Sequence, residues 1–316
     1  MTDSARTAFD GELVEVRPTA AGGALTSAEI TSQPVVWRQA LQLVDPARSA
    51  LAALGERVLF IGCGTSAFVA QAMAELREAA GFGESHWAYA SEFPVGRTYQ
   101  RVVAITRSGT TSEVVDALRQ HCGMAWIVAV TAVGGMPAGA LADEELVLDF
   151  ADERSVVQTR FPTTVLALAR AAFGENVDEL PEACERALAG PVPIDVTAYE
   201  HFVHLGRSWT LGLAHEAALK IRESAQAWAE SYPALDYRHG PIAVAGPRSL
   251  VWFHTPPPEG LVEDVEAVGA TAFVPDVDPL VSLVLAQRVA LEVARSRGLD
   301  PDRPRHLTRS VLLESR

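Results

Sequence analysis

Short runs of continuous apolar residues alternate with amphipathic helix patterns along most of the chain, and this alternation restricts the fold more than any other feature. The run at residues 57–61, for example, is followed by helical spacing of apolar side chains at residues 66–80. A strand that is apolar on both faces must be covered on both faces. The pattern therefore predicts an α/β fold of parallel sheets flanked by helices.

The same patterns divide the chain into an arm and two related halves. Residues 1–25 are small and polar, and we expect a flexible arm there. We expect a first domain with N-terminal helices at residues 26–185 and a second domain with a C-terminal tail at residues 194–316. A break rich in Pro and Gly separates them, starting at Leu180-Pro181 and ending at residues 190–193.

Individual elements follow from the local periodicity. The expected strands are residues 57–61, 87–90, 102–106, 126–131, 145–148, 201–206, 249–254 and 272–274. The expected helices are one that begins near residue 26 and those at residues 35–43, 66–80, 112–120, 156–172, 215–231, 260–268 and 280–297.

Composition excludes several classes of protein. The 316 residues are 48% hydrophobic and carry a formal net charge of -14, which argues against a nucleic-acid surface. We see no signal peptide and no segment that is apolar enough to span a membrane. The three cysteines are widely spaced, as in reduced proteins, and we expect a cytoplasmic location. The histidines form no metal-binding motif, so we expect neither a metal nor a cofactor.

Two clusters of hydroxyl side chains follow predicted strands. Thr65 and Ser66 follow the first strand, and Thr106-Arg107-Ser108 followed by Thr110-Thr111 ends a later one. Each cluster opens a predicted helix, whose first turn has unpaired N–H donors and the positive end of the helix dipole. This arrangement suits an anion such as phosphate.

Two other interpretations of these clusters stay open. Ser and Thr often simply cap helices, although two clusters directly after strands favour a ligand site. A dinucleotide-binding interpretation of Gly62-Cys63-Gly64 is weaker, because Ala67 occupies the position of the third glycine.

A second group of candidates lies on the predicted helix at residues 215–231. Glu216, Lys220 and Glu223 share one face of it, and Glu230 is expected on the same helix. A solvated salt bridge is the ordinary interpretation, but the residues around them are apolar, which predicts partial burial and shifted pKa values. His239 follows in a predicted turn and could form an acid–base pair with a glutamate.

Taken together, these motifs resemble the sugar isomerase (SIS) superfamily, and most closely the isomerase domain of glutamine–fructose-6-phosphate aminotransferase. The resemblance implies two flavodoxin-like SIS domains. It rests on residues 29–34, 62–66, 106–111, 153–164, 217–223, 239–241 and 304–311.

The resemblance also implies roles for particular residues. Those implied to bind a hexose or hexosamine 6-phosphate are Thr65, Ser66, Thr106, Arg107, Ser108, Thr111, Val156 and Thr308. Glu223 matches the base that moves a proton between C1 and C2. His239 matches the ring-opening histidine, which comes from the neighbouring subunit in that family, so we expect a homodimer.

Three departures from the family qualify this expectation. The glutaminase domain of that aminotransferase, which is also called glucosamine-6-phosphate synthase, is absent from the sequence. Arg309 stands where the synthase tail carries an imine-forming lysine, and a protonated arginine cannot form that bond, although it could stabilise an enolate. Arg107 replaces a neutral amide and would add a charge beside the phosphate.

The resemblance therefore predicts an enzyme that converts an amino-sugar 6-phosphate, glucosamine 6-phosphate first, into fructose 6-phosphate and ammonia. The catalytic residues would be Glu223, His239 and Arg309. Two alternatives remain: a deglycase that acts on fructosyl-amine 6-phosphates, and a sugar-phosphate sensor without catalysis, which Arg309 alone favours.

Overall fold

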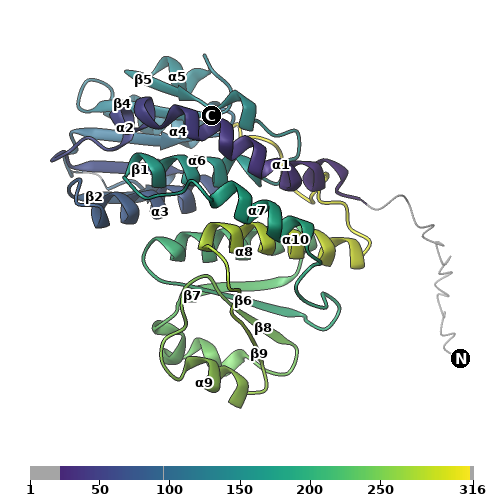
Figure 1. The fold of residues 1–316 in the computed structure, drawn as a ribbon. Helices are drawn as coiled ribbons and strands as arrows, with labels where there is room; N and C mark the ends of the chain where they lie inside the picture. Colours follow the sequence, from purple (N-terminus) through teal and green to yellow (C-terminus); the bar gives the residue numbers. More distant parts are fainter. Residues whose placement is uncertain (1–21, 95, 314–316) are drawn as a thin grey trace, which may run out of the picture.

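The computed structural model describes residues 22–94 and 96–313. Its framework consists of two parallel sheets, one above the other in Figure 1, with helices covering their faces. This arrangement confirms the predicted α/β class with two sheets. The predicted arm lies almost entirely outside the described residues, and the first helix already begins at Ala24.

The first sheet has the strand order β2-β1-β3-β4-β5, which is the flavodoxin-like order. All five residues of β1 are buried, as expected for a strand covered on both faces. Its strands are β1 (Val58–Gly62), β2 (Ser85–Tyr89), β3 (Arg101–Ile105), β4 (Trp126–Thr131) and β5 (Glu144–Val147).

The second sheet repeats this order with one strand fewer, as β7-β6-β8-β9. Its central strand β6 is buried along its whole length. The strands are β6 (His201–Gly206), β7 (Trp228–Pro233), β8 (Ser249–Phe253) and β9 (Thr271–Phe273). The expected repeat of one topology in both halves is therefore present, and the second copy lacks a counterpart of β5 in the part of the chain that is described.

Helices α8 and α10 lie between the two sheets (Figure 1). Gly212 on α8 lets α3 approach closely, since a Cβ atom there would lie 2.5 Å from the Phe68 carbonyl oxygen. Val103 of the first sheet and Trp252 of the second belong to one continuous apolar core. The helices are α1 (Ala24–Ala40), α2 (Val44–Leu51), α3 (Thr65–Ala79), α4 (Ser112–His121), α5 (Pro137–Ala140), α6 (Arg160–Ala172), α7 (Leu180–Ala189), α8 (Trp209–Ala225), α9 (Leu261–Ala267) and α10 (Pro279–Ser296). Short 3-10 helices are η1 (Leu41–Leu43), η2 (Ala90–Glu92), η3 (Asp149–Ala151), η4 (Asp236–His239) and η5 (Pro241–Val244).

The separate helix predicted at residues 35–43 is wrong, because α1 runs through Pro34 without a break. Proline removes one backbone donor and leaves the carbonyl of Ile30, four residues earlier, without its helical partner. The side-chain amide of Gln33 donates to that carbonyl at 3.1 Å. The local replacement of one hydrogen bond explains why proline does not end the helix.

The long helix predicted at residues 215–231 is also wrong at both ends. Helix α8 begins at Trp209 and ends at Ala225, and the left-handed backbone of the next residue, Gln226 (φ 49°), turns the chain into strand β7. Glu230 therefore lies on β7 and not on the helix. The predicted strand set missed β7 because its apolar residues continued the helical pattern.

Two further boundaries differ from the prediction in the connection between the halves. Helix α6 begins at Arg160 and not at residue 156, because the Glu153 carboxylate accepts hydrogen bonds from the N–H groups of Thr159 and Arg160 and so fixes the start of the helix. Helix α7 occupies much of the predicted break, with Pro181 in its first turn, where proline is tolerated. The domain limits at residues 185 and 194 stay predictions.

Candidate active site

The two hydroxyl clusters meet at one edge of the first sheet. Strands β1 and β3 are parallel neighbours, so the loops after them open at the same edge. Strand β2 pairs with the other side of β1, which makes the gap between β1 and β3 the point where the strand order reverses. Ligands of open α/β sheets bind at such points.

The loop after β1 brings the backbone of α3 very close to the strand. A Cβ atom at Gly62 would lie 2.5 Å from the Ser66 carbonyl oxygen, and Gly64 has a positive φ of 52°. Thr65 and Ser66 follow in the first turn of α3 and are almost completely buried. Gly62 and Gly64 therefore allow the close turn that places these two hydroxyls at the positive end of the helix dipole.

The loop after β3 contacts the C-terminal tail. Ser310 Oγ lies 3.2 Å from Ser108 Oγ and 2.9 Å from Thr110 Oγ1. The tail also accepts a hydrogen bond from the Ser112 N–H through the Val311 carbonyl, at 3.2 Å. Three hydroxyls thus cluster beside the first turn of α4. Thr111 is the residue before that helix, and Thr106 is buried at the end of the strand.

Lys220 on α8 joins the first loop to a pair of glutamates. Its Nζ donates to Thr65 Oγ1 at 3.1 Å and to Glu223 Oε2 at 2.6 Å. It also forms an ion pair with Glu216 Oε1 at 3.3 Å. Lys220 and Glu216 are buried, whereas the Glu223 side chain is 19% exposed. The predicted burial of this charged face is confirmed, and Glu223 is its solvent-facing member.

Burial and charge act in opposite directions within this cluster. Burial raises the pKa of Glu216 to about 7, although Lys220 favours the ionised carboxylate. Burial lowers the pKa of Lys220, but the two carboxylates outweigh this effect, so its pKa is raised overall.

The structure directs Arg107 away from its loop. The buried guanidinium donates to the carbonyl oxygens of Ser155 and Arg309, each at 3.0 Å, and lies 3.7 Å from Glu153 Oε2. Burial lowers the pKa of Arg107, and the opposing effect of the nearby Glu153 carboxylate is smaller, so the pKa is lowered overall. Arg107 thus ties the β3 loop to the segment before α6 and to the tail, through hydrogen bonds to two backbone carbonyl groups.

Arg309, in the C-terminal tail, contacts the segment before α6 as well. Its side chain donates to Asp152 Oδ2 at 2.7 Å and to the carbonyl oxygen of Glu153. Val156, half-buried, follows within this segment. Thr308 is exposed, and its hydroxyl donates to the Ser310 carbonyl at 2.9 Å. The tail and the segment at residues 152–156 thus border the β3 loop together.

His239 is the predicted site residue that the structure does not bring to this cluster. It lies at the end of η4, after β7 of the second sheet, and is exposed. In the described part of the chain, no hydrogen bond or ion pair joins it to Glu223.

Sequence reasoning did not assign roles to several residues that organise the site. Lys220 was visible through its spacing on the helix face, but its contact with Thr65 crosses 155 positions and has no local signal. Asp152, Glu153 and Ser310 lie in segments without periodicity. Among the described residues, no group of three or more His, Cys, Asp and Glu side chains could hold a metal. No described helix has both the length and the apolar character needed to cross a bilayer.

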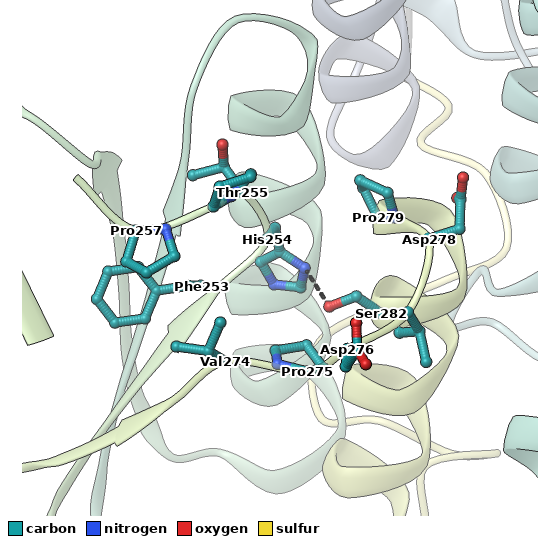
Figure 2. A pocket seen from close by; sticks show the side chains of 12 residues that line it. Phe253, His254, Thr255, Pro257, Val274, Pro275, Asp276, Asp278, Pro279 and Ser282 are labelled. Carbon is teal, nitrogen blue, oxygen red and sulfur yellow. Dashed lines mark hydrogen bonds between the residues drawn. The ribbon is translucent and has the colours of Figure 1, made fainter. Parts of the chain in front are cut away.

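A separate cavity, of about 590 Å³, lies at the ends of β8 and β9 in the second sheet. Figure 2 shows His254 pointing toward Ser282 there, between Thr255 and Pro275. His254 Nδ1 lies 3.0 Å from Ser282 Oγ, and both side chains are buried. Burial lowers the pKa of His254 to about 3, so the ring is neutral. Because this cavity lacks the paired hydroxyl loops and a charged acid–base cluster, we place the candidate active site at the first sheet.

The chain aligns with curated proteins over most of its length. The chain is 29% identical to the glutamine–fructose-6-phosphate aminotransferase of Methanothermobacter thermautotrophicus, over 90% of this chain and 57% of that protein. The corresponding protein of Chlamydia caviae is 30% identical over 72% of this chain and 47% of its own length. The chain thus spans about half the length of these curated relatives.

Solved structures extend the comparison to proteins of similar size. Glucosamine-6-phosphate deaminase from Thermotoga maritima matches with a TM-score of 0.77 and 26% identity, over 92% of this chain and 100% of that chain. Tagatose-6-phosphate ketose/aldose isomerase from Escherichia coli shares the fold, with a TM-score of 0.73, 20% identity and coverage of 95% and 99% of the two chains. No protein-family model matches the chain.

Proposed function

The chain belongs to the SIS family of phosphosugar isomerases, as a homologue of the isomerase part of glutamine–fructose-6-phosphate aminotransferase, and on this premise we propose that it is an amino-sugar-phosphate deaminase. The proposed substrate is glucosamine 6-phosphate, and the products are fructose 6-phosphate and ammonia. The solved structure named as a glucosamine-6-phosphate deaminase supports this choice, because it aligns over its whole length.

The phosphate would bind between the loops after β1 and β3. Thr65, Ser66, Ser108 and Thr111 would donate hydroxyl hydrogen bonds, and the first turns of α3 and α4 would add N–H groups. These donors carry no net charge, so the acidic character of the chain does not oppose such a site. Thr106 would support the loop from its buried position.

Glu223 is the proposed base. In the open-chain sugar, its carboxylate would remove the proton from C2 and return it to C1, while the C2 nitrogen gives one proton to the C1 oxygen, so that the aldehyde and the C2 amine become a hydroxyl at C1 and an imine at C2. Water would then add to the imine, ammonia would leave, and a ketone would remain at C2. The steps balance with one water consumed and need no oxidant, reductant or cofactor.

A ring-opening group must act before Glu223, because the substrate is a closed hemiacetal. We assign this step to His239, supplied by a second copy of the chain, since within one chain it lies apart from Glu223. A neutral imidazole would take the proton of the C1 hydroxyl and give a proton to the ring oxygen. The proposed active unit is accordingly a homodimer. The tail with Thr308 and Arg309 and the segment with Val156 would close over the sugar.

The observation that carries the proposal is the position of Lys220, which touches both Thr65 and Glu223. The proposed base and the proposed phosphate loop are thus held by one side chain. A hexose whose 6-phosphate is bound at Thr65 would therefore extend its carbon chain toward Glu223.

The test is a turnover screen with the purified protein. We expect wild-type protein to release ammonia and fructose 6-phosphate from glucosamine 6-phosphate, and Glu223→Gln to lose at least 100-fold in kcat, about what loss of an acid–base group removes. Full activity of Glu223→Gln would refute the assigned base. Preferred turnover of a fructosyl-amine 6-phosphate would identify a deglycase, and binding of sugar phosphate without any turnover would identify a sensor.

A further inference from the structure

Glu223 also borders a cavity of about 400 Å³ that lies between the end of α8 and the C-terminal tail. The residues that line it are Arg222, Glu223, Gln226, Arg305, His306 and Leu307. A tail histidine and the proposed base thus line one cavity within one chain. Of these side chains, the imidazole of His306 is the one, besides the Glu223 carboxylate, that enzymes commonly use for proton transfer.

The tail is fixed on both sides of His306. Before it, the Asp302 carboxylate accepts hydrogen bonds from the N–H groups of Leu25 and Thr26, each at 2.8 Å. After it, Arg309 pairs with Asp152 and Ser310 bonds to the β3 loop. His306 is thus held in a short span between two anchored segments, and its position depends on tertiary contacts.

The backbone of His306 is left-handed, with φ at 60°. This conformation is unfavourable for a residue with a side chain, and it persists only where the surroundings determine it. His306 lines the same cavity as Glu223. Its left-handed backbone marks a position that the tertiary contacts of the tail determine.

Building on the proposed deaminase function, we propose that His306 is a catalytic residue of the step that breaks the C2–N bond. Movement of the proton between C2 and C1 needs only Glu223, whereas loss of ammonia needs two further proton transfers. A second acid–base group beside C2 is therefore required, and His306 supplies it from the same chain as Glu223.

Neutral His306 takes a proton from the water that attacks the C2 iminium, so that a C–O bond forms and a carbinolamine results. The imidazolium then gives this proton to the nitrogen. The C2–N bond breaks, ammonia leaves, and the Glu223 carboxylate takes the hydroxyl proton as the C2 ketone forms. The protonated C2 imine and water thus become the ketone and ammonia, with one proton left on Glu223.

Two assays separate this step from the one before it. Exchange of the C2 proton of glucosamine 6-phosphate with deuterium in D₂O reports Glu223, and ammonia release reports the whole reaction. The variant is His306→Asn, because asparagine tolerates the left-handed backbone but cannot transfer the proton. We expect ammonia release to fall about 100-fold while exchange stays within about threefold of wild type.

Matched variants make the outcome decisive. Glu223→Gln and His239→Asn should lose both activities, since they act before the C2–N bond breaks. Added imidazole should restore ammonia release to His306→Gly, whose glycine also accepts the backbone conformation. Wild-type ammonia release by His306→Asn, or equal loss of both activities, would overturn the assignment. Absence of both activities in the wild-type protein would instead overturn the proposed function.

Discussion

Lys220 and Glu223 form an ion pair, with 2.6 Å between Nζ and Oε2, three residues apart on helix α8. The same ammonium group donates to Thr65 at the start of α3. Helices α3 and α8 belong to different halves of the chain, so this contact joins the two halves at the candidate active site. The position of Glu223 therefore depends on the packing between the halves.

Removal of Lys220 should destabilise the protein as well as inactivate it. In Lys220→Met, two carboxylates on one helix face lose the cation that pairs with both, and Glu216 is left buried without its counter-ion. We expect the free energy of unfolding to fall by about 3–5 kcal/mol, the usual cost of breaking a buried pair. Urea denaturation at pH 7.5 measures this change.

Glu216→Gln serves as the control for that variant. Added to Lys220→Met, it removes one of the two stranded carboxylates and should recover part of the lost stability. A double variant that is no more stable than Lys220→Met would contradict the buried-charge explanation and would point to loss of packing by the lysine stem.

The raised pKa of Glu216 predicts a specific pH dependence of stability. Its pKa is about 7 in the folded protein and 4.5 in an unfolded chain, so the folded state binds more protons between these values. The stabilisation from this proton is present below pH 4.5 and is lost as the pH rises through 7. The difference in unfolding free energy between wild type and Glu216→Gln should shift by on the order of 3 kcal/mol from pH 4.5 to pH 8.

His254 should produce the opposite dependence in the second half. Burial lowers its pKa from 6.5 to about 3, so only the unfolded state gains a proton as the pH falls below 6.5. The free energy of unfolding should decrease from pH 6.5 downward, by about 2 kcal/mol at pH 5. In His254→Gln this part of the decrease should be absent. Ser282→Ala removes the hydrogen bond but keeps the titrating ring, so its destabilisation should be similar at both pH values.

The sequence predicts what is local in this protein and misses what depends on distant contacts. Strand positions and the flavodoxin-like order follow from apolar periodicity and from the resemblance, and both hydroxyl loops follow from strand–helix junctions. Strand β7 and the uninterrupted helix α1 do not, because Gln226 and Gln33 act through backbone conformation and a side-chain hydrogen bond that override the pattern. The orientation of Arg107 likewise depends on Ser155 and the tail.

The contact between Arg309 and Asp152 should contribute to substrate binding through the tail. The pair is partly exposed, with 38% and 33% of the two side chains accessible, so its own strength is modest. We expect Arg309→Ala and Asp152→Ala each to raise KM for glucosamine 6-phosphate by about two- to fivefold, and the double variant to add little. Fully multiplicative effects in this double-mutant cycle would show that the two residues act independently.

Phosphate recognition by the β3 loop can be separated from recognition of the sugar. Ser108→Ala removes the hydroxyl that contacts both Thr110 and the tail residue Ser310. If this hydroxyl binds phosphate, the variant should raise KM for glucosamine 6-phosphate by about tenfold, as expected for loss of a hydrogen bond to a charged group. The affinity for unphosphorylated glucosamine, measured by inhibition, should change little. Ser310→Ala is the matched control, because it removes the same tail contact and leaves Ser108 in the loop. A rise in KM that is equal in both variants would assign the effect to docking of the tail and would refute a direct contact between Ser108 and the phosphate.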